Sequence, residues 1–202
     1  MASSWERLYT STAGAGGLYE FDTGVSGITA KEHLKVVIHI VKNSTNENTI
    51  AIRFNGDSTA NQYPIRRATD GAGDSTLTNY TYLYQGYGGT NVDRFLVMNI
   101  INIAGKEKLV RMEQTLSSNS RTEIAGKWVT TAGQITDIQC HGIASFDTSY
   151  VPFGEGSSMT IYGADDDVLS YTYPNIPNGA IFEESDTGKH YMFDGSQTWN
   201  EM

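Results

Sequence analysis

The chain has 202 residues and a formal net charge of -9, with 14 Lys and Arg against 23 Asp and Glu. Hydrophobic residues make up 39% of the chain and charged residues 18%, which is too apolar and too weakly charged for a disordered protein. The acidic balance argues against nucleic acid as a partner, because phosphates are bound by clustered Lys and Arg. We expect one domain of ordinary size with a small appendage.

Neither a membrane span nor a secretion signal is evident in the sequence. The longest apolar run, Phe95 to Ile101, is too short to cross a bilayer. Residues 1–7 lack the charged-then-apolar pattern of a signal peptide. The lone Cys140 cannot form an intrachain disulfide, and we expect it to be reduced and buried. These features predict a protein made in a cytosol, with no membrane partner.

Eight segments show the β-branched or alternating pattern that is typical of strands. They are residues 33–41, 49–54, 76–84, 94–103, 106–116, 127–131, 134–141 and 159–163. Apolar residues on both faces of Arg94–Ile103 predict burial on both sides of that strand. Residues 107–117 have helix-favouring side chains but no N-cap box, so we predict a strand there. The Gly-, Asp-, Ser- and Thr-rich stretch 58–74 predicts a surface loop.

Short strands at roughly ten-residue spacing predict an all-β fold, an antiparallel β-sandwich or jelly roll over residues 1–167. Pro174 and Pro177 predict an extended linker over residues 168–179. Residues 180–202 are predicted to form a small C-terminal β-hairpin extension. Its strands are expected at residues 180–184, 190–193 and 197–201.

The C-terminal extension carries several aromatic residues but is too short to bury them. About 23 residues cannot make an independent core, because small isolated sheets are marginal in water. The aromatic side chains therefore need the sandwich, a second subunit or another protein to pack against. We predict that they form a docking interface, and they are Phe182, Tyr191, Phe193 and Trp199.

No motif predicts a catalytic centre, a metal site or a cofactor. The four His residues are scattered, and Gly154–Ser158 lacks the closing Gly of a nucleophile elbow. Cys140 and His141 are neighbours on a strand, so their side chains point to opposite faces and cannot form a thiolate–imidazolium pair. The acidic run Asp165–Asp167 could donate oxygen atoms to calcium but lacks EF-hand spacing, and a solvated loop is the favoured interpretation. We predict a protein that is not an enzyme.

Tyr80, Tyr82 and Tyr84 lie on one face of the strand predicted over residues 76–84. Three interpretations stay open for them. The rings cover one face of a sheet, they anchor an interface between subunits, or they stack on the sugar rings of a glycan.

Residues 50–63, which read Ile-Ala-Ile-Arg-Phe-Asn-Gly-Asp-Ser-Thr-Ala-Asn-Gln-Tyr, resemble a stretch of a β-sandwich family of tailed bacterial and archaeal viruses. That family also tends to begin with a Trp-rich strand, here residues 5–8, and to continue with a Leu-Lys-Val-Val-Ile strand, here residues 34–38. The strand at residues 135–138 and the closing Gly-Ser-x-x-Thr-Ile-Tyr-Gly segment at residues 156–163 also fit.

Residues 182–199 are similar to a C-terminal motif found on many virion proteins. The motif reads Phe-x-Glu-Thr-Asp-Thr-x-Lys-x-Tyr-x-x-Asp-Gly-x-x-Trp. In this chain Ser185 stands where Thr is usual, and Phe193 stands where Trp or Tyr is common.

The resemblance implies a non-enzymatic virion structural protein that brings no catalytic residues. Such a protein would be a capsid decoration, head-surface or fibre component of a tailed phage, made in the host cytoplasm and located in the virion. It would assemble as a homo-oligomer, with a trimer as one form, and dock onto other virion proteins of the capsid or tail through its C-terminal hairpin. The alternative is a glycan-binding module at the tail tip, for host attachment.

Overall fold

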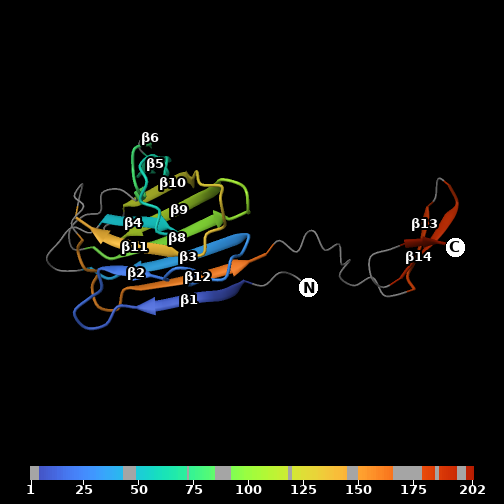
Figure 1. Ribbon diagram of the computed structural model, residues 1–202, viewed down its shortest axis with the longest axis horizontal. Coiled ribbons are helices and arrows are strands. Elements are labelled where there is room, and N and C mark those ends of the chain that lie inside the picture. Colours follow the sequence, from blue (N-terminus) through green and yellow to red (C-terminus); the bar gives the residue numbers. More distant parts are fainter. Residues whose placement is uncertain are drawn as a thin grey trace. The chain divides into compact units, whose positions relative to one another are not determined.

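The computed structural model describes residues 5–42, 49–71, 73–84, 92–117, 120–144, 150–165, 179–184, 187–194 and 199–202. The described residues fall into two compact units, one over Trp5–Asp165 and one within Asp166–Met202 (Figure 1). Both units are built of β-strands, and the described residues contain no helix.

Two antiparallel sheets make up the described part of the larger unit (Figure 1). The larger sheet has eight strands in the spatial order β1 (Glu6–Thr12), β12 (Ser158–Ala164), β3 (His33–Ile40), β8 (Arg94–Ile101), β9 (Lys108–Leu116), β10 (Arg121–Trp128), β5 (Ile65–Thr69) and β6 (Ser75–Leu77). The smaller sheet has four strands in the order β2 (Glu20–Asp22), β11 (Ile138–Ile143), β4 (Thr49–Phe54) and β7 (Leu83–Tyr84).

The hydrophobic core of the larger unit is shared by the two sheets. Buried residues alternate with half-buried ones along β3 and with exposed ones along β9, so each strand turns one face inward. Ile50, Ile52 and Phe54 of β4 belong to the same hydrophobic cluster as the inward-facing residues of β3 and β8. This β-sandwich-like arrangement confirms the predicted all-β class. β9 also confirms the strand that we predicted in place of a helix.

The two edge strands of the larger sheet are irregular or short. In β1 the register with β12 shifts between Arg7 and Tyr9, which marks a bulge. β6, at the opposite edge, has three residues.

Two segments of the larger unit differ from their predictions. Residues 65–69, expected in a surface loop, form β5, which pairs with β10. β5 escaped prediction because polar residues such as Arg66 and Arg67 give it no apolar run. The strand expected over residues 76–84 is divided, since β6 ends at Leu77 in one sheet and β7 begins at Leu83 in the other.

β8 is buried on one face, whereas its sequence predicted burial on both. Leu96, Met98 and Ile100 face the core. On the opposite face Phe95 is 50% exposed and Ile101 is 41% exposed. The prediction was wrong because the smaller sheet covers only one face of the larger one.

Asn55 forms a corner at the end of β4 and joins segments that are far apart in the sequence. It has a φ of 51°, in the left-handed region that Asn tolerates. Its side-chain oxygen accepts the backbone N–H groups of Thr136 at 2.9 Å and Asp137 at 3.0 Å. The Asn55 side chain therefore fixes the start of β11 against the end of β4.

Asp57 extends this corner toward β10. Its Oδ2 accepts the Nε1–H of Trp128 at 2.7 Å, and its Oδ1 accepts the N–H of Thr59 at 2.9 Å. The hydroxyl of Tyr63 accepts the N–H of Phe54 at 3.1 Å and donates to the Asp57 carbonyl at 2.8 Å. These bonds explain why Asn55, Asp57 and Tyr63 suit their positions in this stretch.

The C-terminal unit is a three-stranded antiparallel sheet in the order β13 (Ile181–Glu184), β14 (Lys189–Phe193) and β15 (Trp199–Glu201). Gly188 immediately precedes β14 and has a φ of 67°, a conformation that favours glycine.

We predict that Asp57→Asn lowers the free energy of unfolding by about 1–3 kcal/mol, because it weakens the acceptor of the buried Trp128 indole. Burial alone would raise the pKa of Asp57, but hydrogen bonds from Trp128, Thr59 and Thr130 outweigh burial and the pKa is lowered. A lowered carboxyl pKa stabilises the fold above the unfolded pKa of about 3.9, and this stability is lost as the pH falls through the folded pKa.

Urea unfolding of both proteins across the pH range measures this effect. The difference between wild type and Asp57→Asn is expected to be full at neutral pH and to shrink below about pH 4. A difference that stays constant down to the acid limit would contradict the role of the ionised carboxylate.

Candidate functional site

The C-terminal unit exposes apolar side chains on both faces of its sheet. Ile181 and Met192 lie directly opposite each other in the register, and Ile181 is 62% exposed. On the other face Phe182 is 52% exposed, and its ring centroid is 6.4 Å from that of Tyr191. Met202 is exposed as well. Two of the predicted interface residues, Phe182 and Tyr191, are thus brought together, with aliphatic neighbours that the aromatic pattern did not single out.

The other two aromatic residues predicted for this interface are Phe193 and Trp199. Phe193 is only 3% exposed, so its ring belongs to the covered part of the unit and not to the exposed apolar surface. Its backbone bonds to both Gly179 and Ala180, which ties the residues before β13 to the end of β14. Trp199 begins β15, and its side chain lies outside what the structure describes.

The tyrosines of the predicted strand at residues 76–84 are not a row on one sheet face. Tyr80 and Tyr82 precede β7, are half-buried and pack against the core, with ring centroids 5.7 Å apart. The guanidinium carbon of Arg53 lies 5.9 Å from the centroid of the Tyr82 ring. Both rings therefore help to cover the hydrophobic core of the larger unit. The side chain of Tyr84 lies outside the described part.

The outer face of the larger sheet, on the side away from the core, is the second candidate surface. The strand register places four rows of outward side chains across β3, β8, β9 and β10. The rows are His33, Ile101, Leu109 and Lys127; Lys35, Asn99, Arg111 and Ala125; Val37, Val97, Glu113 and Glu123; and His39, Phe95, Thr115 and Arg121.

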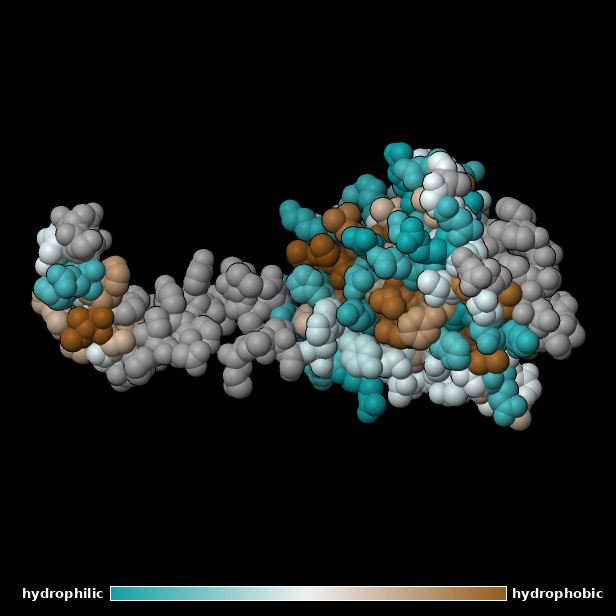
Figure 2. Space-filling model, turned by 180° about the vertical axis from the view of Figure 1, so that it is seen from behind, coloured by the Kyte–Doolittle hydropathy of each residue, from teal (hydrophilic) through white to brown (hydrophobic). Residues whose placement is uncertain are grey.

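A mainly apolar hollow of about 420 Å³ lies at one end of this outer face. Trp5, Ile101 and Leu109 are among the residues that line it. The Nζ of Lys35 lies 5.3 Å from the centroid of the Trp5 ring, within the range of a cation–π contact. Figure 2 shows apolar residues gathered in patches among hydrophilic ones on one side of the larger unit.

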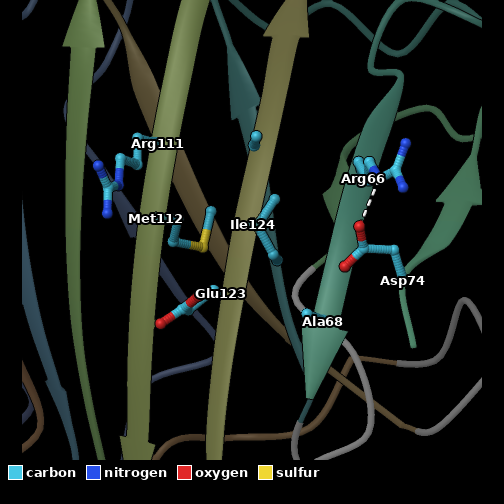
Figure 3. Close-up of a pocket in the computed structure, with 8 residues that line it drawn as sticks. Arg66, Ala68, Asp74, Arg111, Met112, Glu123 and Ile124 are labelled. Atoms are coloured by element: carbon cyan, nitrogen blue, oxygen red, sulfur yellow. Dashed lines mark hydrogen bonds and ion pairs between the residues drawn. The ribbon is translucent and has the colours of Figure 1, made fainter. Parts of the chain in front are cut away.

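A second hollow, of about 330 Å³, shares Arg111 and Ala125 with the first, and four of its eight lining residues are charged. Figure 3 shows Arg111 and Arg66 on opposite sides of it, with the Nε of Arg66 donating to Asp74 at 2.6 Å. Ala68 and Ala125 leave the space between them open, because their side chains are a single methyl group.

The charges beside this hollow alternate in sign. Glu113 of β9 lies directly opposite Glu123 of β10, a like-charge pair that is unfavourable by itself. Each carboxylate has a partner on its own strand, since Arg111 lies 3.1 Å from Glu113 and Arg121 lies 3.6 Å from Glu123. The face therefore presents both signs in a chain whose net charge is -9.

An acid–base pair lies on the smaller sheet, where His141 of β11 is opposite Glu20 of β2. Nδ1 of His141 is 3.3 Å from Oε1 of Glu20, and the ring centroid of Tyr150 is 5.1 Å from that of His141. Burial lowers the pKa of His141 to about 4, and Arg53 acts in the same direction. Burial, followed by the charge of Asp22, raises the pKa of Glu20. The imidazole is therefore uncharged at neutral pH, and neither of the two hollows is lined by this pair.

The remaining groups singled out by the sequence are Cys140 and the acidic run at residues 165–167. Cys140 lies fully buried in the hydrophobic cluster, and burial raises the pKa of its thiol. In the acidic run at residues 165–167, Asp165 accepts a hydrogen bond of 2.9 Å from Lys31, and its two neighbours lie outside the described residues. No group of three or more His, Cys, Asp or Glu side chains suited to a metal ion occurs in the part of the chain that the structure describes.

Comparison of the chain with protein-family models, with curated proteins and with solved structures finds no match. None of the described residues belongs to a helix that could cross a membrane. A functional assignment therefore rests on the exposed surfaces and on the residues themselves.

We predict that His141 titrates with a midpoint of about 4 rather than its ordinary 6.5, because the folded protein disfavours the charged imidazole. The unfolded chain binds this proton near pH 6.5, so the stability that the neutral imidazole contributes is full above that pH and is lost as the pH falls toward about 4. Glu20 acts in the opposite sense, since its raised pKa favours the folded protein on acidification.

Comparison of wild type with His141→Gln separates the contribution of His141 to the pH dependence of stability from that of Glu20. The free energy of unfolding, measured in urea, is expected to fall less in the variant than in wild type as the pH is lowered from 6.5 to about 4. The His141 midpoint is measured directly by NMR titration of its ring protons. A midpoint near 6.5 would show that the ring is solvated and would contradict the prediction.

Proposed function

We propose that the chain is a non-enzymatic structural protein of a virus particle, a capsid decoration, head-surface or fibre component that forms homo-oligomers and docks through its C-terminal unit. The observation that carries the proposal is the apolar surface of that unit. Ile181, Phe182, Met192 and Met202 are all exposed on a sheet of three short strands.

Docking follows from the cost of leaving this surface in water. Burying a large apolar side chain contributes about 1.5–3 kcal/mol before entropy losses. Ile181 and Met192 on one face, and Phe182 on the other, give the unit more apolar surface than three strands can cover. A partner that covers one face would recover this free energy, and the resemblance of residues 182–199 to a virion motif supports another virion protein as that partner.

The order of the strands supports the jelly-roll part of the proposal. Eight strands occupy the positions of two facing four-stranded sheets, β1-β12-β3-β8 and β2-β11-β4-β7. The chain runs through this set in the order β1, β2, β3, β4, β7, β8, β11 and β12. In this order it passes repeatedly between the two sheets, as in a double-sheet jelly roll. On this view β5, β6, β9 and β10 are two inserted hairpins that widen the larger sheet.

The contacts of the residues that carry the resemblance support a structural role. Asn55, Asp57 and Tyr63 each bond to backbone or to a buried indole, and these contacts hold the corner between β4, β10 and β11. Such residues would be retained for the fold and not for a reaction, as expected of a family that brings no catalytic residues.

Glycan binding at a tail tip is the alternative function. Tyr80 and Tyr82 are half-buried against the core, so they offer less ring surface to a sugar than exposed loop tyrosines would. The exposed C-terminal surface favours docking over this alternative. Binding of the full chain to a defined sugar on a glycan array would favour glycan recognition instead.

We predict that the double variant Ile181→Asp with Phe182→Asp weakens docking by at least ~100-fold, because two large apolar contacts are lost. The variant is expressed during infection with the virus that carries the chain, and its copies per particle are counted by mass spectrometry. Electron microscopy of labelled particles then distinguishes a capsid position from a fibre position. A chain without residues 180–202 is expected to keep its sandwich fold and to assemble equally poorly.

Glu183→Gln is the matched control, because this exposed side chain lies on the same strand and its change adds no charge. The control is expected to enter particles at the wild-type level. Normal incorporation of the double variant or of the shortened chain would refute docking through the C-terminal unit.

A further inference from the structure

An apolar strip runs along the outward face of β8, in the middle of the larger sheet. Phe95 and Ile101 are exposed at the two ends of the strand, and Val97 and the polar Asn99 lie between them. β8 is paired on both sides, with β3 and with β9, so the strip is not at an edge. Apolar side chains in this position are typical of a face that packs on another layer.

The charges beside the strip make the face complementary to itself. Along β9, Arg111 is followed two residues later by Glu113, and along β10 Arg121 is followed by Glu123. A copy of β9 that runs in the opposite direction, centred on Met112, presents Glu113 where the first copy presents Arg111. A two-fold axis produces this arrangement, because both partners then use the same patch.

We propose that two copies of the chain pair through the outer face of the larger sheet, about a two-fold axis that crosses β9 at Met112. The axis lies between the two sheets and perpendicular to the strands, so corresponding strands run antiparallel. Along β9, Arg111 lies over Glu113 of the second copy. Along β8, Ile101 lies over Phe95 of the second copy. Each contact occurs twice, once for each partner.

The charged hollow receives a side chain in the same arrangement. Rotation about this axis brings Glu123 of the second copy over Ala125 of the first. Ala125 is opposite Arg111 on one side and opposite Arg66 on the other, so the carboxylate enters the hollow of about 330 Å³ between two guanidinium groups. Arg66 in turn lies over Ala68 of the second copy, which sets a long side chain against a short one.

A second copy fits this face better than a partner of a single charge. Both signs are interspersed on β9 and β10, whereas nucleic acid would need a cationic surface. The strands of packed sheets stay within about 30° of parallel or antiparallel, so the pairing of rows holds over the central strands β8, β9 and β10. The interface also combines apolar side chains on β8 with charged side chains on β9 and β10, as stable interfaces combine both kinds.

Two charge variants of the full chain test the pairing. The first, Glu113→Arg with Glu123→Arg, makes the face cationic, and the second, Arg66→Glu with Arg111→Glu, makes it anionic. Each variant alone is expected to dimerise ~100-fold more weakly than wild type, because like charges then meet across the axis. An equimolar mixture of the two is expected to form a heterodimer, since every reversed charge meets its opposite. Sedimentation velocity measures all three samples.

The control, Glu155→Arg with Glu183→Arg, makes the same number of reversals away from the face and is expected to dimerise as wild type does. Circular dichroism checks the fold of each variant. If either charge variant does not fold, Ala125→Phe, which fills the hollow without changing charge, is expected to abolish dimerisation.

A wild-type chain that is monomeric at its highest soluble concentration, or trimeric, would overturn the proposal. A wild-type dimer that neither charge variant weakens, or that Ala125→Phe leaves intact, would overturn it too. The pairing defines one interface for the homo-oligomer of the proposed function but is tested separately. A dimer in solution that never enters particles would refute only the virion role, and particles containing a monomeric chain would refute only the pairing.

Discussion

One hydrophobic core between two sheets limits the central strands of the larger sheet to a single buried face. β3 and β9 meet this limit with strict alternation, and their outward residues are polar or half-buried apart from Leu109, which is 53% exposed. β8 does not, since Phe95 and Ile101 remain exposed after Leu96 and Met98 have reached the core. Ile181 and Phe182 show the same excess in the C-terminal unit. In both places the apolar surface exceeds what the fold can bury, and assembly is the physical process that removes such an excess.

The corner at Asn55 and Asp57 supplies the cohesion that the core alone does not provide. It connects the end of β4 to the start of β11 through a side-chain amide, and to β10 through a carboxylate and the Trp128 indole. With one free cysteine and no disulfide, the larger unit depends on such polar links where the chain changes sheet. Asn55, Asp57 and Tyr63, which belong to the stretch 50–63, are therefore part of the scaffold.

Strand positions could be predicted from the sequence wherever burial is periodic, as in β3, β4 and β12. β5 could not, because Arg66 and Arg67 give no apolar signal and the strand depends on pairing with β10, more than fifty residues later. The same limit applies to the candidate surfaces. The exposure of Phe182 followed from the shortness of the C-terminal segment. The burial of Phe193 depends on how the unit closes, and the grouping of Arg66, Ala125 and Arg111 depends on the register of three strands.

The bulge in β1 and the three-residue β6 have a consequence for the geometry of any assembly. A long, regular outermost strand would let sheets join side by side without limit, as fibrils do. Here the register slips between Arg7 and Tyr9 at one border, and the other border ends in a strand of three residues. Lateral growth is thereby discouraged, which leaves contacts of fixed stoichiometry as the way for this molecule to join a larger structure.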